Sequence, residues 1–97
     1  MNKEKERMLS GKLYQGNDEE LVAERAEAKK KCFKINNISP EKSHEIMKNI
    51  KELFGEMGEN ASVKTPIMCD YGYNISLGEN SFINHDCIFL DIGKIKI

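Results

Sequence analysis

Charged and apolar positions divide the chain into two parts of different character. Residues 1–60 hold 24 of the 31 charged side chains, and their apolar residues recur at helical spacing. Residues 61–97 hold seven charges, and their isoleucines and aromatic residues are interrupted by glycine and asparagine, as in short strands joined by turns. The sequence therefore predicts an α+β chain, with a helical N-terminal subdomain over residues 1–60 and a β segment over residues 61–97.

Two helices are predicted at the start of the chain. The first is the short charged segment Lys3–Leu9. The second begins after Asp18, whose carboxylate can accept hydrogen bonds from the backbone N–H groups of the first turn, and it ends at Asn36 and Asn37. Its apolar stripe is narrow, so we expect this helix to pack against the β segment or against a neighbouring subunit.

A third helix is predicted between Ser39 and Gly58. Ser39 and Pro40 suit the N-cap and the first helical position, and Gly58 is a plausible stop. The apolar residues of this segment recur at the spacing of one helical face: Ile46, Met47, Ile50, Leu53, Phe54 and Met57. This is the most regular apolar pattern of the N-terminal part.

From residue 71 onward the pattern repeats every six residues. The first position of each six is large and apolar: Tyr71, Leu77, Ile83, Phe89 and Ile95. The fifth position is mostly small: Ile75, Ser81, Cys87 and Gly93. A plain strand repeats every two residues and a helix about every 3.6. The period of six therefore predicts a parallel β-helix of hexapeptide rungs, with both positions facing its interior.

The alternative is an antiparallel hairpin that turns at Gly78, Glu79 and Asn80, but this leaves the small residues in register unexplained. A β-helix needs several stacked turns to bury its core, and four and a half hexapeptides are too few. Because the sequence also stops within a rung, at Ile97, we expect the chain to be truncated.

The charge balance excludes several classes of partner. Fifteen basic and sixteen acidic side chains leave a net charge of −1, which argues against electrostatic binding to nucleic acid or to an anionic membrane. No apolar run approaches the roughly 18 residues of a membrane span, and the charged start lacks the apolar stretch of a secretory signal. We therefore expect a cytoplasmic protein.

The cysteines and histidines predict no metal site. Cys32, Cys69 and Cys87 are odd in number and widely spaced, as expected of reduced thiols. His85, Asp86 and Cys87 carry ligand atoms, but consecutive residues of a strand point to opposite faces and cannot converge on one ion.

Three motifs carry a resemblance to a known family: G-K-L-Y at residues 11–14, C-D-Y-G-Y-N-I at 69–75 and F-I-N-H-D-C-I-F-L-D at 82–91. Together with the helical segment, they resemble the maltose/galactoside O-acetyltransferases, which are hexapeptide-repeat acyltransferases, over almost the whole chain. The resemblance implies a homotrimer of left-handed β-helices with active sites between subunits. It also implies transfer of an acetyl group from acetyl-CoA to a sugar hydroxyl.

The resemblance assigns a catalytic role to Asn84. It matches the family asparagine that assists at the transition state, where an amide can donate to a developing oxyanion; its structural alternative is a corner residue of the coil. The family's base is a histidine of a later coil, followed by proline, and His85 does not match it. The base and most of the coenzyme A groove are therefore expected outside this sequence, and the 97-residue chain is expected to be inactive by itself.

Four residues match or adjoin the family's acceptor-binding positions. Asp70 and Tyr71 match positions that line the sugar pocket, and Asp70 is alternatively a simple turn residue. Asp91 lies beside the acidic position that contacts the acceptor. Arg25 could reach the sugar from the second helix, or it could form a surface ion pair with Glu20 or Glu24.

Two other functions stay open. One is a non-catalytic module in which the helices and rungs serve trimerisation only. The other is a hexapeptide acyltransferase whose acceptor is an amino sugar or another amine.

Overall fold

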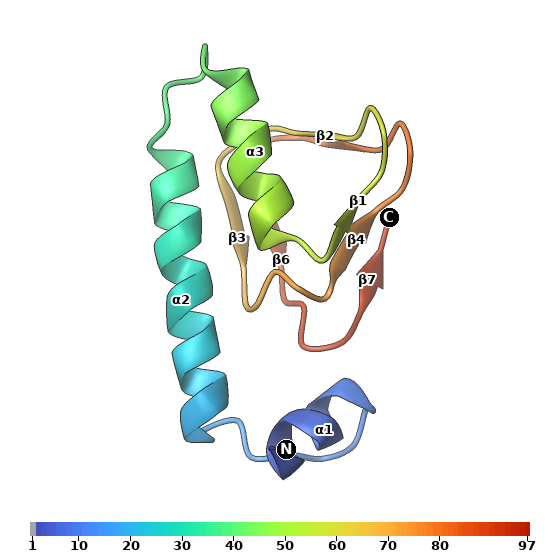
Figure 1. The fold of residues 1–97 in the computed structure, drawn as a ribbon. Coiled ribbons are helices and arrows are strands. Elements are labelled where there is room, and N and C mark those ends of the chain that lie inside the picture. The colour runs from blue at the N-terminus through green and yellow to red at the C-terminus, as the bar shows by residue number, and fades with distance from the viewer. Residues whose placement is uncertain (1) are drawn as a thin grey trace.

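The computed structural model describes residues 2–97, which form three helices followed by a coil of short strands (Figure 1). The helices are α1 (Lys3–Leu9), α2 (Glu19–Asn36) and α3 (Ser43–Leu53). The strands are β1 (Glu56–Met57), β2 (Ser62–Val63), β3 (Ile67–Cys69), β4 (Ile75–Leu77), β5 (Phe82–Ile83), β6 (Cys87–Phe89) and β7 (Ile95–Lys96). Every strand pair is parallel, in the orders β1-β4-β7, β2-β5 and β3-β6. The predicted parallel coil is confirmed, and the antiparallel hairpin is excluded.

Each turn of the coil is longer than three hexapeptides. Strand partners lie twenty residues apart along the chain, as in the pair of Glu56 with Ser76, whereas three hexapeptides would give eighteen. Within the strands the predicted register is confirmed, because Ile75, Leu77 and Ile83 are all buried in the coil interior. The additional residues must therefore lie between strands.

The additional residues lie where β3 connects to β4 and where β6 connects to β7. We call these segments the β3–β4 corner (residues 70–74) and the β6–β7 corner (residues 90–94). Tyr71 and Gly93 fall in these corners, so the interior positions predicted for them are wrong. Tyr71 is buried in a separate cluster with residues of α1 and α2, and Gly93 is exposed.

The first two helices are confirmed, including the predicted cap. Asp18 accepts a hydrogen bond from the N–H of Leu21 (3.2 Å). Asn2 caps α1 by accepting from the N–H groups of Glu4 and Lys5 (2.8 and 3.1 Å). The amide of Asn2 also donates to the Asp18 carboxylate (2.7 Å), and this hydrogen bond lowers the pKa of Asp18. The ends of the two helices are therefore fastened together.

Helix α3 is shorter than predicted at both ends. It starts later because a hydrogen bond from the N–H of Lys42 to the carbonyl of Ser39 (2.9 Å) closes a turn ahead of it. It ends earlier because Phe54 has extended backbone angles and Met57 lies on β1. Both apolar residues still contact the core, which explains why the helical spacing continued past the helix. The first strand thus precedes residue 61, where the β segment was expected to begin.

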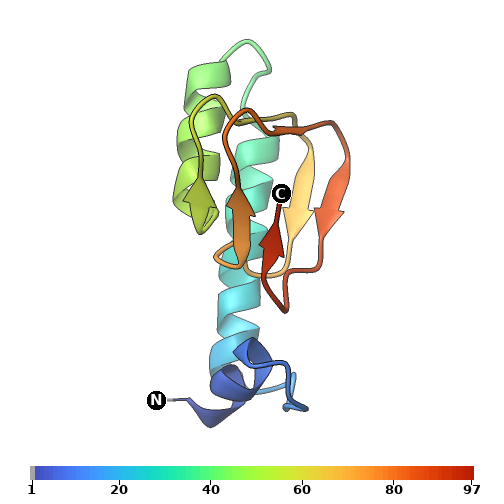
Figure 2. The same cartoon turned by 90° about the vertical axis from the view of Figure 1, so that its right-hand side faces the viewer.

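Helices α2 and α3 cover the free edge of the first turn of the coil (Figures 1 and 2). Helix α2 runs beside β3, and α3 lies against β2. Their apolar faces and the coil interior form one core, with members Ala28, Cys32, Ile35, Ile46, Ile50 and Leu53 from the helices and Val63, Ile67, Cys69, Ile75, Leu77 and Ile83 from the coil. Neither part has a core of its own.

One side chain takes the place of a strand partner at this edge. Asn36, the last residue of α2, donates to the carbonyl of Ile67 (2.8 Å) and accepts from the N–H of the same residue (2.9 Å). Ile67 lies on β3, which pairs with β6 along its other edge. The amide therefore satisfies two backbone groups that an unpaired edge strand would expose.

Replacing Asn36 with alanine is expected to lower the free energy of unfolding by about 2 kcal/mol, because both backbone groups of Ile67 lose their partners. Asn37→Ala is the matched control, since that exposed side chain, directly after α2, donates only to the carbonyl of Phe33 in the helix (2.7 Å). It should change stability by no more than about 0.5 kcal/mol. Urea denaturation followed by circular dichroism measures both variants, and equal losses would contradict the role of Asn36.

Candidate functional site

Three of the residues expected at the acceptor side gather at the β3–β4 corner. Arg25, Asp70 and Tyr71 line one open pocket of about 520 Å³, although they come from α2 and from the coil. The rest of the lining consists of Tyr14, Gly16, Asn17, Val22 and Ile92. We call this the corner pocket.

Asp91, in the β6–β7 corner, holds the backbone of the β3–β4 corner in place. Its side chain is fully buried, and its carboxylate accepts hydrogen bonds from three consecutive backbone N–H groups of the preceding turn of the coil: Asp70 (3.0 Å), Tyr71 (2.9 Å) and Gly72 (2.7 Å). Hydrogen bonds to a charged acceptor in a dry site are among the strongest in proteins. The structure thus places Asp91 under the pocket and Ile92 in its lining, which corrects the expectation that the Asp91 carboxylate reaches the acceptor.

A side chain of the β3–β4 corner also donates hydrogen bonds to the β6–β7 corner. The buried amide of Asn74 donates to the carbonyls of Asp91 (2.8 Å) and Ile92 (3.2 Å). Gly72 has a positive φ of 91°, and a Cβ there would lie 2.6 Å from the carbonyl oxygen of Leu53. Only glycine fits this close approach between the corner and the end of α3.

Arg25 connects the second helix to the corner. One guanidinium nitrogen donates to the hydroxyl of Tyr71 (2.7 Å) and another donates to the carbonyl of Gly16 (2.8 Å). The alternative ion pair with Glu20 or Glu24 is not what the structure shows, because Glu24 pairs with Lys5 (2.7 Å) and Glu20 accepts from the amide of Asn2 (2.7 Å). Arg25 therefore holds one side of the pocket together and fixes the orientation of Tyr71.

The pocket can both donate and accept hydrogen bonds. Burial raises the pKa of Tyr71 and outweighs the opposite effect of the hydrogen bond from Arg25. The phenol is therefore protonated at neutral pH. Because its oxygen accepts from Arg25, the hydroxyl hydrogen can be donated to a ligand. The half-buried Asp70 adds carboxylate oxygens to the same lining. This pair of groups suits a ligand that carries hydroxyls.

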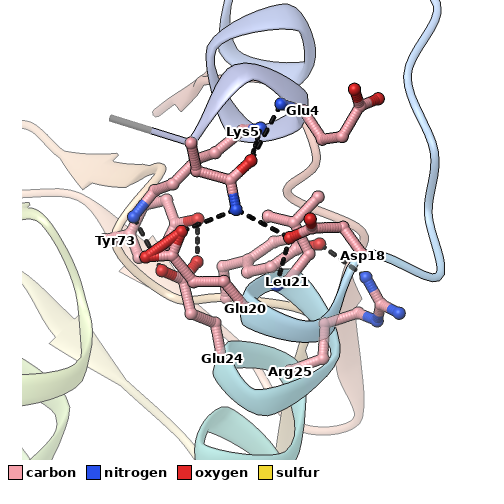
Figure 3. A network of polar contacts seen from close by, with 10 residues as sticks. Glu4, Lys5, Asp18, Glu20, Leu21, Glu24, Arg25 and Tyr73 are labelled. Atoms are coloured by element: carbon pink, nitrogen blue, oxygen red, sulfur yellow. Dashed lines mark hydrogen bonds and ion pairs between the residues drawn. The ribbon is translucent and has the colours of Figure 1, made fainter.

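A polar network fastens α1 to α2 (Figure 3). Tyr73 donates to Glu24 (2.6 Å), which also accepts from Lys5 (2.7 Å), and the Lys5 ammonium lies 4.9 Å from the centre of the Tyr73 ring. Burial, followed by the Glu24 carboxylate, raises the pKa of Tyr73 well above its usual range. The network holds the Tyr73 ring 5.3 Å from the ring of Tyr71 and so supports the pocket wall.

Asn84 lies elsewhere, between β5 and β6. Its side-chain oxygen accepts from the backbone N–H of His85 (2.8 Å), and the residue is exposed. The positive φ of this turn falls on Asp86, so Asn84 does not have the left-handed backbone of a corner asparagine such as Asn80. The structure does not bring Asn84 to the corner pocket of the same chain.

Sequence reasoning missed several lining residues. Tyr14 packs against the cluster of Met8, Leu21 and Tyr71 and lines the pocket with Gly16. The G-K-L-Y motif contains Tyr14, so it was the signal that could have placed this segment at the site.

Within residues 2–97, no helix combines the length and the apolar character that crossing a bilayer requires. The same residues contain no group of three or more histidine, cysteine, aspartate or glutamate side chains placed to share a metal ion.

Comparison with known proteins agrees with this architecture. Residues 7–58 match the family model described as the maltose acetyltransferase hexapeptide capping motif. The structure of a maltose O-acetyltransferase from Clostridium difficile 630 is similar to 94% of this chain and 49% of its own, with 49% identity and a TM-score of 0.90. A hexapeptide-repeat acetyltransferase of Vibrio cholerae, solved with acetyl coenzyme A, is similar over 100% of this chain and 51% of its own, with 34% identity and a TM-score of 0.85.

A Staphylococcus aureus protein (strain MRSA252), named provisionally as an acetyltransferase, is 42% identical over 95% of this chain and 47% of its own. The parallel coil, with α2 and α3 packed on its first turn, defines the class of fold: a hexapeptide-repeat coil with a helical cap. The chain belongs to the maltose acetyltransferase family, as the three motifs indicated. It spans about half the length of the relatives it matches.

Asp91→Asn is expected to lower the free energy of unfolding by about 3 kcal/mol, because an amide supplies one acceptor oxygen where a carboxylate supplied two. Asp86→Asn is the matched control: the residue is exposed, and asparagine tolerates its φ of 60°. Urea denaturation measures both variants. A loss at Asp91 no larger than that at Asp86 would contradict the anchoring of the corner by this carboxylate.

Proposed function

We propose that this chain supplies the acceptor-binding part of an enzyme that transfers an acetyl group from acetyl-CoA to a sugar hydroxyl. The observation that carries the proposal is the corner pocket, where a tyrosine hydroxyl and a carboxylate of the β3–β4 corner line one surface with a guanidinium of α2. Family membership and the acetyl coenzyme A complex of the Vibrio cholerae relative support acetyl transfer. The maltose O-acetyltransferase from Clostridium difficile supports a sugar as acceptor.

Two side chains of the corner pocket bind the acceptor in this proposal. Tyr71 donates to a sugar oxygen, and Asp70 accepts from a sugar hydroxyl. A site built around such groups rejects molecules that lack the hydroxyl, since its own polar atoms would then be left unpaired. Arg25 acts by holding Tyr71, because its hydrogen bonds join that side chain to the segment around Gly16.

Acetyl transfer needs a base for the hydroxyl proton and a donor for the oxyanion of the thioester. The sugar oxygen attacks the thioester carbon, the base takes the proton, and the thiolate of coenzyme A leaves. Asn84 is the proposed donor to the oxyanion, through the amide nitrogen, because its oxygen already accepts from the N–H of His85. The base and most of the acetyl-CoA groove are supplied by residues outside this chain.

A complete site requires more than one subunit in this proposal. Asn84 and the corner pocket lie at different corners of a single coil, so they can contribute to one site only from neighbouring chains. A homotrimer of left-handed coils, as the family resemblance implies, would provide that arrangement. Exposed apolar side chains on the outer faces of the coil, Met68, Phe82 and Ile88, support such contacts. The proposal includes the cytoplasmic location expected from the sequence.

A chimera with a relative tests the function. Residues 1–97 are joined to the part of the Clostridium difficile maltose O-acetyltransferase that lies beyond the matched region, and release of coenzyme A thiol is followed with maltose, a galactoside and glucosamine as acceptors. We expect acetylation of a sugar hydroxyl by the chimera and no turnover by residues 1–97 alone. A folded, trimeric chimera that acetylates none of these acceptors would refute the proposal. Product on the amine only would favour the amino-sugar alternative.

Two variants of the chimera separate binding from catalysis. Asp70→Asn should raise the KM for the sugar about tenfold and leave the KM for acetyl-CoA unchanged, because only the acceptor loses a hydrogen bond to a charged partner. Asn84→Ala should lower kcat about 100-fold, the usual effect of removing one oxyanion donor. Asp86→Asn, beside Asn84, is the control and should alter neither. Unchanged kinetics in both Asp70 and Asn84 variants would contradict their assigned roles.

A further inference from the structure

Two buried cysteines from different elements touch in the core. The sulfur atoms of Cys32 on α2 and Cys69 on β3 lie 3.7 Å apart, and their side chains are 0% and 2% exposed. The proposed acetyl transfer uses neither thiol. The third cysteine, Cys87, is half-buried on β6, and its sulfur lies 3.9 Å from the carbonyl of His85.

Neighbouring hydrogen bonds fix the position of the two sulfurs. Asn36 follows Cys32 by one helical turn on the same face of α2, and Ile67 shares a face of β3 with Cys69. The two hydrogen bonds between Asn36 and Ile67 (2.8 and 2.9 Å) therefore hold the helix against the strand directly beside the thiols. A disulfide has an S–S length of about 2.05 Å, so the sulfurs need to approach by about 1.7 Å, within reach of side-chain rotation and a small helix shift.

We infer that Cys32 and Cys69 form a peroxide-reactive dithiol site that closes to a disulfide joining α2 to β3. The inference does not depend on the acetyltransferase proposal, because it rests on the contact between the helical cover and the coil and not on the corner pocket.

The contact between the thiols also supplies the nucleophile. The hydrogen bond between the two thiols lowers the pKa of Cys32, and the same hydrogen bond, together with burial, raises the pKa of Cys69. A thiolate is the reactive form of cysteine. Hydrogen peroxide is small and uncharged, so it can reach the sulfur when the contact between α2 and β3 opens locally.

The oxidation balances with peroxide as the only co-reactant. The Cys32 thiolate attacks one oxygen of hydrogen peroxide, the O–O bond breaks, and the products are a sulfenic acid and a hydroxide that takes up a proton to become water. The Cys69 sulfur then attacks the Cys32 sulfur, the S–O bond breaks, and a second water leaves with the proton of the Cys69 thiol. Two thiols lose two electrons and two protons, and one peroxide becomes two waters.

The disulfide would tie the helical cover to the first turn of the coil. It closes a loop between residues 32 and 69 and so restricts the unfolded chain, which stabilises the folded state. For a chain of this size we expect the Tm to rise by about 10 °C on oxidation.

The test treats the folded 97-residue chain with hydrogen peroxide, blocks the remaining thiols with iodoacetamide after unfolding, and maps the peptides by mass spectrometry. We expect a peptide pair joined through Cys32 and Cys69, an alkylated Cys87, a raised Tm, and reversal of both changes by dithiothreitol. Cys87→Ala should behave like the parent chain. Cys32→Ala and Cys69→Ala should each lose the linked pair and the rise in Tm.

Even if an alanine variant fails to fold, the peptide map of the parent chain tests whether Cys32 and Cys69 form the disulfide. Recovery of Cys32 and Cys69 as separate alkylated thiols, or as separate sulfinic acids, would overturn the inference. A linkage that involves Cys87, or one between two chains, would overturn it as well.

Discussion

The free edge of the first coil is the constraint on which the rest of the structure depends. A parallel coil begins with strands that have a partner on one side only, and exposed strand edges invite pairing with other chains. Here α2 and α3 cover that edge, and the amide of Asn36 satisfies the N–H and the carbonyl of Ile67 as a neighbouring strand would. The apolar faces of the same helices complete the coil core. The same two helices therefore protect the strand edge and complete the hydrophobic core, so they are an integral part of the β-helix fold.

The corner pocket follows from a departure from the hexapeptide repeat. Two additional residues in each turn lengthen the β3–β4 and β6–β7 corners, which places Tyr71 outside the coil interior, where it contacts Leu21 of α2. In the lengthened corner the N–H groups of Tyr71 and Gly72 have no strand partner, and Asp91 of the next turn accepts both of them, together with that of Asp70. The same deviation therefore creates the pocket and requires a buried carboxylate beneath it. The backbone of Asp70 and Tyr71, whose polar groups face the pocket, is held by Asp91, which does not line it.

The sequence predicted the parallel coil because large and small residues recur with a period that neither a helix nor a plain strand produces. It also predicted the start of α2, since Asp18 caps that helix through its own side chain. The period could not reveal the longer corners, because Tyr71 is as large and apolar as an interior residue and keeps the period of six by coincidence. The end of α3 was missed for a related reason: Phe54 and Met57 face the same core from extended backbone.

For the site, the family resemblance suggested Arg25, Asp70 and Tyr71 as acceptor-binding candidates, and the structure brings these three residues together from distant parts of the chain. The resemblance could not show whether Asp91 or Ile92 lines the pocket. The length of the corner determines which of two adjacent side chains faces the coil interior. The contact of Cys32 with Cys69 was likewise invisible, since it depends on where α2 lies along β3.

Amide hydrogen exchange, followed residue by residue by NMR, tests most directly whether the helices act as the missing neighbour of the first coil. The N–H groups of Ser62 and Lys64 are bonded to the second turn of the coil (2.9 and 2.8 Å), whereas that of Ile67 is bonded to the helix residue Asn36. The account predicts that Ile67 exchanges as slowly as the other two. Rapid exchange of Ile67 beside protected Ser62 and Lys64 would show that the edge is open and would contradict it.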